Sequence, residues 1–300
     1  MMKKLFMLCV LACAGCLTAL AAKPVVKDMG ESKYCIEVGD LSMIVNGGAG
    51  GKILSLKYKD AEVISQSRWP ESFGSTFWTS PQKEWNWPPV PEFDKRPYQV
   101  ELKKKSLVMK SETSERLKCS VQKEFTVDAK DNAIVITYSI VNEGAEERSV
   151  APWEITRVPN DGLIFFDAPV DAIFPAGLMT FKEAYGAAWY QTDATQENRK
   201  VNADGKGWLA YACNGLLLVK QFQDLEPSQP APGEAEIQVY VNRGKSYIEL
   251  ESQGAYTALK PGQKLSWTVR WHLVPYEGDS LPSQELLDKV RQIAKFSAKS

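Results

Sequence analysis

Residues 207–222 read GWLAYACNGLLLVKQF and give the clearest indication of the fold class. Two apolar segments flank the dipeptide Asn214-Gly215. Asn-Gly is the preferred two-residue linker of a type I′ turn, whose twist matches that of two antiparallel strands. The stretch therefore predicts a β-hairpin.

The rest of the chain carries the same strand signals. Apolar and polar side chains alternate, or β-formers cluster, between turn residues in several further segments. These segments are residues 117–127, 134–140, 236–241, 246–252 and 265–273. Only residues 283–296 have helical spacing, with Ser283 as a candidate N-cap. A long series of hairpins with one terminal helix predicts an all-β sandwich or barrel.

The composition is that of an ordinary globular protein. Hydrophobic residues make up 44% of the chain and the formal net charge is −1. No basic patch is present, which argues against nucleic-acid binding. No shift in composition marks a boundary between residues 30 and 275, so we predict a single domain over residues 23–300.

Residues 1–22 read as a secretory signal peptide. Lys3 and Lys4 precede an apolar segment, and Ala19-Leu20-Ala21 offers a small-x-small cleavage site. The apolar segment is too short for an integral membrane span. Ala14-Gly15-Cys16 resembles the end of a lipidation box, so a lipid anchor is the alternative. We expect an exported protein, periplasmic or secreted.

Three cysteines remain after the leader, which are Cys35, Cys119 and Cys213. They allow at most one disulfide, so the chain is no disulfide scaffold. A single histidine and dispersed cysteines argue against a zinc site. No calcium-binding loop such as DxDxDG is present, although this leaves other calcium sites open. We expect no metal site and no cofactor.

Tryptophans and prolines gather in residues 69–94, WPESFGSTFWTSPQKEWNWPPVPEFD. Proline does not fit inside a helix or a central strand, so the segment predicts a loop. Its tryptophans then either fold over the core or line a site. The rings in question are Trp69, Trp78, Trp85 and Trp87.

Three stretches together resemble the galactose-mutarotase-like β-supersandwich, and specifically an uncharacterised family of secreted bacterial proteins with that fold. Residues 46–64 resemble the glycine-led opening hairpin of aldose 1-epimerases. The segment GSTFWTSPQKEWNWPP, residues 74–89, stands where epimerases have a segment near the sugar site. Residues 247–271 resemble the late epimerase segment that runs Leu-Glu-x-Gln, then Pro-Gly, then a strand.

The resemblance implies a sugar site. Aldose epimerases open and reclose a pyranose with a glutamate base and a histidine acid. Glu251 matches the position of the base. The segment that carries the acidic histidine corresponds to residues 151–162, where this chain has Glu154 and Arg157 instead. The only histidine, His272, matches neither epimerase histidine.

Alternation places Glu249, Glu251, Tyr247 and Gln253 on one face of a strand. That face either lines a site or is a solvated outer surface. Two close carboxylates raise the pKa of one of them, as a catalytic base requires.

The other candidates each have a structural alternative. The tryptophan rings can stack on a pyranose or fill the core, and Gln82 and Asp94 can add hydrogen bonds. Arg157 either pairs with Glu154 or binds a sugar hydroxyl or carboxylate. The candidate catalytic residues are Glu251, Glu249 and His272, and the candidate binding residues are Trp78, Gln82, Trp85, Trp87, Asp94, Glu154, Arg157 and Lys220.

Three functions remain open. The first is a secreted or periplasmic carbohydrate-binding protein. The second is a sugar-active enzyme, either an epimerase with a non-histidine acid or a lyase using Tyr185 or Tyr190. The third is a structural partner in a surface glycan system. A concave pocket holding Glu251 beside a tryptophan wall would favour the first two, and a flat exposed tryptophan patch the third.

Overall fold

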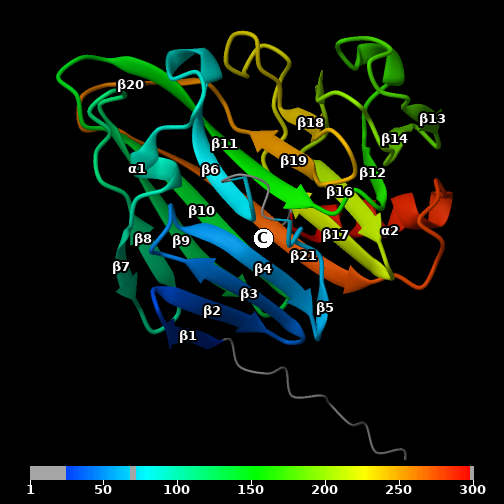
Figure 1. Ribbon diagram of the computed structural model, residues 1–300, viewed down its shortest axis with the longest axis horizontal. Coiled ribbons are helices and arrows are strands. Elements are labelled where there is room, and N and C mark those ends of the chain that lie inside the picture. Colours follow the sequence, from blue (N-terminus) through cyan, green and yellow to red (C-terminus); the bar gives the residue numbers. More distant parts are fainter. Residues whose placement is uncertain (1–24, 68–71, 298–300) are drawn as a thin grey trace, which may run out of the picture.

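The chain folds into two large β-sheets with a helix at the C-terminal end (Figure 1). The computed structural model describes residues 25–67 and 72–297. The expected leader, Cys16 and Trp69 lie outside the described residues. Neighbouring strands run antiparallel throughout both sheets of the described part.

The first sheet has 11 strands within the described residues. Its order is β1 (Val25–Gly30), β2 (Lys33–Val38), β3 (Leu41–Asn46), β4 (Lys52–Tyr58), β6 (Ser75–Ser80), β11 (Arg148–Val158), β19 (Ile248–Gln253), β18 (Ile237–Val241) and β15 (Arg199–Ala203). Two short strands complete it: β5 (Ala61–Glu62) pairs with β4, and β20 (Thr257–Leu259) pairs with β11.

The second sheet has 10 strands in the same part of the chain. Its order is β13 (Lys182–Ala184), β14 (Ala187–Gln191), β12 (Leu163–Phe166), β16 (Trp208–Cys213), β17 (Leu216–Gln221), β21 (Lys264–Pro275), β10 (Ala133–Asn142), β9 (Cys119–Asp128), β8 (Leu107–Lys110) and β7 (Gln99–Leu102). The helical elements are η1 (Gln82–Glu84), α1 (Pro91–Asp94), η2 (Val170–Ala172) and α2 (Gln284–Ser297).

The predicted hairpins are confirmed. Strands β16 and β17 pair around Asn214 and Gly215, which both have positive φ, +49° and +77°, as a type I′ turn requires. The pairs β9–β10 and β18–β19 also form, and β21 pairs with both β10 and β17. The expected all-β class and terminal helix are therefore correct.

The prediction of a loop over residues 69–94 is wrong for its central part. Residues 75–80, STFWTS, form strand β6, which lies between β4 and β11 and is buried along its whole length. Aromatic and threonine side chains suit such a strand, and its sequence contains no proline. Pro81 follows directly after the strand ends, so the prolines delimit β6 rather than exclude it.

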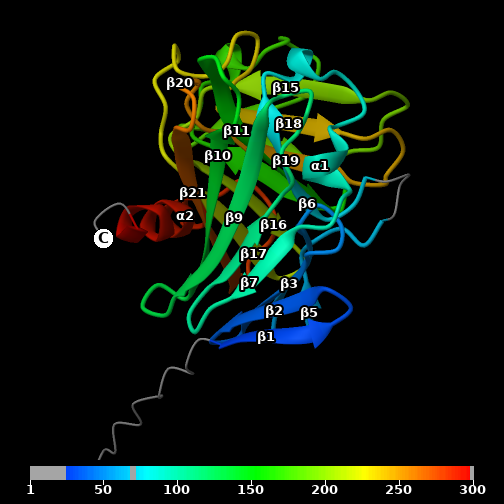
Figure 2. The same ribbon diagram turned by 90° about the vertical axis from the view of Figure 1, so that its left-hand side faces the viewer.

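The sheets pack face to face. Phe77 on β6 stacks on Tyr138 of β10, with ring centroids 4.3 Å apart, and so joins the two layers. Figure 2 shows β6, β18 and β19 on one side of the molecule and α2 on the other, outside β17 and β21. Ser283 caps α2 by accepting the backbone N–H of Leu286, as predicted. No helix among the described residues is long and apolar enough to cross a membrane.

Candidate functional site

The outer face of the first sheet carries a row of polar and aromatic side chains. Phe77 on β6 points toward the second sheet, so its neighbour Trp78 points the opposite way. Directly paired residues share a face, and Trp78 pairs with Trp153 on β11. The same face continues across the sheet, as Arg157 pairs with Glu249, Glu249 with Tyr240, and Tyr240 with Lys200.

A cavity of about 480 Å³ lies over this row. Its volume falls in the range of pockets that hold small molecules. It combines tryptophan and tyrosine rings with two carboxylates, amides and an ammonium group. The residues that line it are Ser72, Trp78, Gln82, Trp87, Trp153, Asn198, Lys200, Tyr240, Asn242, Tyr247, Glu249 and Glu251.

Glu251 is held by two donors. Its Oε2 accepts hydrogen bonds from the indole Nε1 of Trp153 (2.8 Å) and the Nζ of Lys200 (2.9 Å). Lys200 also lies 4.6 Å from the Trp153 ring centroid, a cation–π contact. The Glu251 side chain is 1% exposed, so these contacts orient the carboxylate against the cavity wall.

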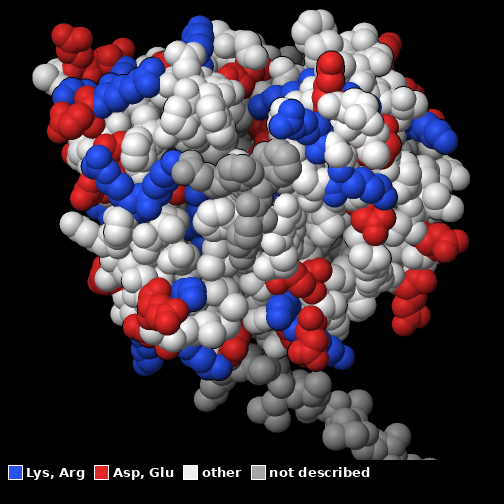
Figure 3. Space-filling view, viewed as in Figure 1, with Lys and Arg blue, Asp and Glu red and all other residues white. Residues whose placement is uncertain are grey.

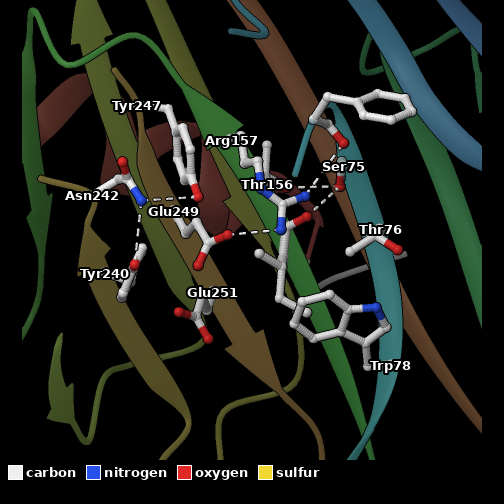
Figure 4. A network of polar contacts seen from close by, with 12 residues as sticks. Ser75, Thr76, Trp78, Thr156, Arg157, Tyr240, Asn242, Tyr247, Glu249 and Glu251 are labelled. Carbon is white, nitrogen blue, oxygen red and sulfur yellow. Dashed lines mark hydrogen bonds and ion pairs between the residues drawn. The ribbon is translucent and has the colours of Figure 1, made fainter. Parts of the chain in front are cut away.

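Glu249 is paired with a buried arginine. Its Oε1 lies 2.7 Å from an Nη of Arg157 (Figure 4). The guanidinium lies between the rings of Trp78 and Tyr247, 5.9 and 5.7 Å from their centroids. Burial raises the pKa of the Glu249 carboxyl, and Glu251 adds to the rise, while Arg157 opposes it. Arg157 therefore positions a cavity residue and does not itself line the cavity.

Two tyrosine hydroxyls are held by one amide. Asn242 Nδ2 donates to the hydroxyls of Tyr240 (3.3 Å) and Tyr247 (3.2 Å), as Figure 4 shows. The Asn242 carbonyl oxygen accepts a hydrogen bond from Ser246 Oγ at 2.6 Å, which fixes the orientation of the amide. Burial raises the pKa of Tyr240 to about 12, so its hydroxyl is protonated at neutral pH. These groups provide the cavity with fixed hydrogen-bonding partners.

Trp78 is the centre of the aromatic wall. Its ring meets those of Trp85, Trp87 and Trp153 edge to face, at 5.5, 6.0 and 5.4 Å between centroids. Trp85 is only 2% exposed and donates its indole N–H to the carbonyl of Thr79. The prediction that Trp85 forms a contact surface is wrong. It packs behind Trp78 and Trp153 because η1 turns it into the core.

Asp94 is also behind the wall rather than in the cavity. Its Oδ1 accepts hydrogen bonds from the Trp78 indole N–H (2.9 Å) and Thr76 Oγ1 (3.0 Å). Its Oδ2 forms a buried ion pair with Lys52 at 2.9 Å. This geometry does not support the expected direct hydrogen bond between Asp94 and a ligand. Asp94 instead fixes the Trp78 ring.

Glu154 and Lys220 lie between the two sheets. They form an ion pair at 2.7 Å with both side chains fully buried, and Glu154 also accepts from Tyr138 and Trp271. Glu154 does not pair with Arg157, because residues three apart on a strand point to opposite faces. Neither residue therefore belongs to the candidate site.

His272 is remote from the cavity as well. It lies on β21 in the second sheet, whereas the cavity lies on the far face of the first. Burial and the neighbouring Arg270 lower its pKa to about 4, so the ring is neutral at pH 7. The geometry does not support a catalytic role for His272 in this cavity.

Three further candidates lie elsewhere. Gln253 shares the face of Glu251, as predicted, but donates to Glu234 and Gln238 beyond the cavity. Tyr185 is 52% exposed next to β14, and Tyr190 on that strand is buried. Neither tyrosine lines the cavity.

Six lining residues were not among the predicted site residues, namely Ser72, Trp153, Asn198, Lys200, Tyr240 and Asn242. Trp153 had a usable signal, because it lies four residues before Arg157 and so shares its face on a strand. Lys200 had no such signal in the sequence, because β15 carries no motif. Only the order of strands in the first sheet brings β15 to the site.

The described residues hold no cluster of three or more histidine, cysteine or acidic side chains suited to a metal ion. Cys35, Cys119 and Cys213 are free and buried. On the face shown in Figure 3, acidic and basic side chains are interspersed over the surface.

The comparisons with known proteins agree on the fold. The structure is similar to a galactose mutarotase-like protein from Lactobacillus casei ATCC 334, with a TM-score of 0.56 and 10% identity over 81% of this chain and 100% of that one. It is similar to a galactose mutarotase-like protein from Clostridium acetobutylicum, with a TM-score of 0.53 and 11% identity over 84% and 98%. The chain has the galactose mutarotase-like fold.

This fold also occurs as part of a longer protein. A TPR-domain containing protein from Parabacteroides distasonis ATCC 8503 matches with a TM-score of 0.56 and 15% identity, over 86% of this chain and 50% of that one. No family model matches the sequence, and no curated protein matches it. The galactose mutarotase-like fold is therefore established by structure alone.

Proposed function

We propose that the protein binds a carbohydrate in the cavity over β6, β11, β15, β18 and β19. The observation that carries the proposal is the pairing of a tryptophan wall with two oriented carboxylates, Glu249 and Glu251, in one concave site. An aromatic ring stacks on the apolar face of a pyranose, and carboxylates accept hydrogen bonds from its hydroxyls.

The cavity also argues against a role that is only structural. A protein contact through the tryptophans would call for a flat exposed patch. Here Trp78 is 5% and Trp153 2% exposed, and both rings belong to the wall of a hollow. The galactose mutarotase-like fold supports sugar recognition in addition.

Calorimetry and thermal shift with a panel of monosaccharides test the proposal. Glu251→Gln keeps the shape of the side chain but removes its charge, so we expect at least a tenfold loss of affinity, roughly 1.4 kcal/mol. Glu147→Gln, at an exposed position away from the cavity, is the matched control and should bind like the wild type. If Glu251→Gln also binds like the wild type, the cavity is not the sugar site.

Sugar epimerase chemistry is the second candidate, and the raised pKa of Glu249 is what favours it. Glu251 would take the proton of the anomeric hydroxyl, and Glu249, when its carboxyl carries a proton, would deliver that proton to the ring oxygen. The bond between C1 and the ring oxygen would then break to give the open-chain aldehyde, and reversal would close the ring on either face.

Polarimetry with freshly dissolved α-glucose and α-galactose separates binding from catalysis. We expect acceleration on these free sugars to be weak or absent, because the cavity has no histidine acid and one missing acid–base group costs about 10²–10⁴-fold. Rapid mutarotation that is lost in both Glu249→Gln and Glu251→Gln would establish the enzyme instead.

Export is part of the proposal, since residues 1–22 have the pattern of a signal peptide. We expect the protein outside the cytoplasm, either free or anchored through Cys16. Cell fractionation of wild type and Cys16→Ala tests both, because only an anchored protein is released from the membrane fraction by the substitution.

A further inference from the structure

The most exposed tryptophan of the described residues belongs to the cavity. Trp87 lines the cavity and is nevertheless 62% exposed. The other two tryptophans of the lining, Trp78 and Trp153, are almost completely buried. Trp87 is therefore much more open to solvent than a ring that serves only to close the cavity wall.

Its neighbours hold Trp87 in this outward position. Trp85 is anchored in the core two residues earlier, and Asn86 between them adopts a left-handed conformation with φ of +58°. Asparagine tolerates this conformation better than most residues. Pro88 and Pro89 follow directly and restrict the backbone. One constrained turn thus carries a buried and an exposed tryptophan.

The ring is supported by the aromatic wall. Trp78 meets it edge to face, with centroids 6.0 Å apart and planes at 78°. An exposed aromatic surface held in place before binding loses little conformational freedom when a ligand covers it. The exposed ring of Trp87 is therefore suited to stack on a ligand, and we call it the platform.

The cavity and the platform are continuous but chemically different. Inside, Glu251, Lys200 and the hydroxyls of Tyr240 and Tyr247 offer hydrogen-bonding groups to a polar ring. Outside, Trp87 offers a bare apolar surface and no buried carboxylate. A single pyranose would contact the hydrogen-bonding groups inside the cavity, and a second sugar unit linked to it would reach the platform.

We infer that Trp87 forms a second subsite, which stacks a sugar residue linked to the one in the cavity, so that the ligand is an oligosaccharide or the end of a longer glycan. This inference rests on the proposed function, because the inner unit occupies the cavity described above. It adds that a free monosaccharide fills only part of the site.

Calorimetry with sugars of matched composition tests the inference. The probes are glucose, galactose, xylose and N-acetylglucosamine, each with disaccharides and trisaccharides of the same unit. For whichever series binds, we expect the oligosaccharide to bind about tenfold more tightly than its monosaccharide. Trp87→Ala should remove most of that gain, because it should lower the affinity for the oligosaccharide by a larger factor than the affinity for the monosaccharide.

Phe174→Ala is the matched control, because Phe174 is 68% exposed and does not line the cavity. It should change neither affinity. If monosaccharide and oligosaccharide bind equally to the wild type, or if Trp87→Ala lowers both by the same factor, the second subsite does not exist although the cavity binds sugar. If Trp87→Ala leaves the oligosaccharide gain intact, Trp87 serves another partner. If no sugar of either length binds, the proposed function fails and the subsite with it.

Discussion

The single histidine, His272, allows the burial of side chains on the second sheet to be tested through its pKa. His272 is 4% exposed on β21, where Arg270 joins burial in lowering its pKa to about 4. Asp128 and Asp131, which pair with Arg270, oppose this effect without overcoming it. In the unfolded chain the imidazole titrates near 6.5.

Because these two pKa values differ, the stability of the protein depends on pH. As the pH falls below 6.5, the unfolded chain takes up a proton that the folded protein refuses until about pH 4. The stability that comes from the neutral ring is therefore complete above pH 6.5 and is lost as the pH falls toward 4. The difference corresponds to about 3 kcal/mol in the free energy of unfolding.

His272→Gln removes this titration while keeping a polar side chain of similar size. The free energy of unfolding of the wild type, minus that of the variant, should rise by about 3 kcal/mol between pH 4 and 6.5 in urea melts. Because the chain has one histidine, its ring signals in an NMR titration belong to His272 without further assignment. A midpoint near 6.5, or parallel stability curves for the two proteins, would show that the ring is solvated.

Three other substitutions test the interior. Glu236 accepts the backbone N–H groups of Gly207 and Leu225, and burial raises its pKa to about 7. Its contribution is complete below about pH 4.5 and is lost as the pH rises to 7, so Glu236→Gln should gain stability relative to the wild type over that window, as followed by urea melts. Trp85→Ala should cost about 3–5 kcal/mol, measured the same way at pH 7, because it leaves a void behind the aromatic wall. Lys220→Met strands the Glu154 charge and should cost about 3–5 kcal/mol, whereas adding Glu154→Gln should recover part of the loss in thermal melts.

The alternation of side chains carried most of what the sequence could predict. The strands of the hairpins follow from period two, and so does the common face of Tyr247, Glu249 and Glu251, which do meet in one cavity. This works because β19 has a strongly polar face. A slip of one residue would bury both carboxylates toward the second sheet.

The same rule fails on a strand that carries charged residues on both faces. Strand β11 places Glu154 toward the second sheet and Arg157 toward the cavity, and both side chains are almost fully buried. Because its charged residues do not share one face, the pattern of β11 alone does not tell which charge faces the ligand. On a helix, residues three apart lie on one face and can form an ion pair. On a strand they lie on opposite faces, so Glu154 and Arg157 cannot pair.

Sheet order accounts for the residues that the sequence could not reveal. The cavity draws on five strands that are adjacent in space but far apart along the chain, and the carboxylate of Glu251 shows the consequence. Its donors, Trp153 on β11 and Lys200 on β15, lie 98 and 51 residues away. Lys200 is in the site only because β15 pairs with β18, which in turn pairs with β19. Local patterns determine which face each side chain occupies, but only the order of strands in the sheet determines which faces form one site.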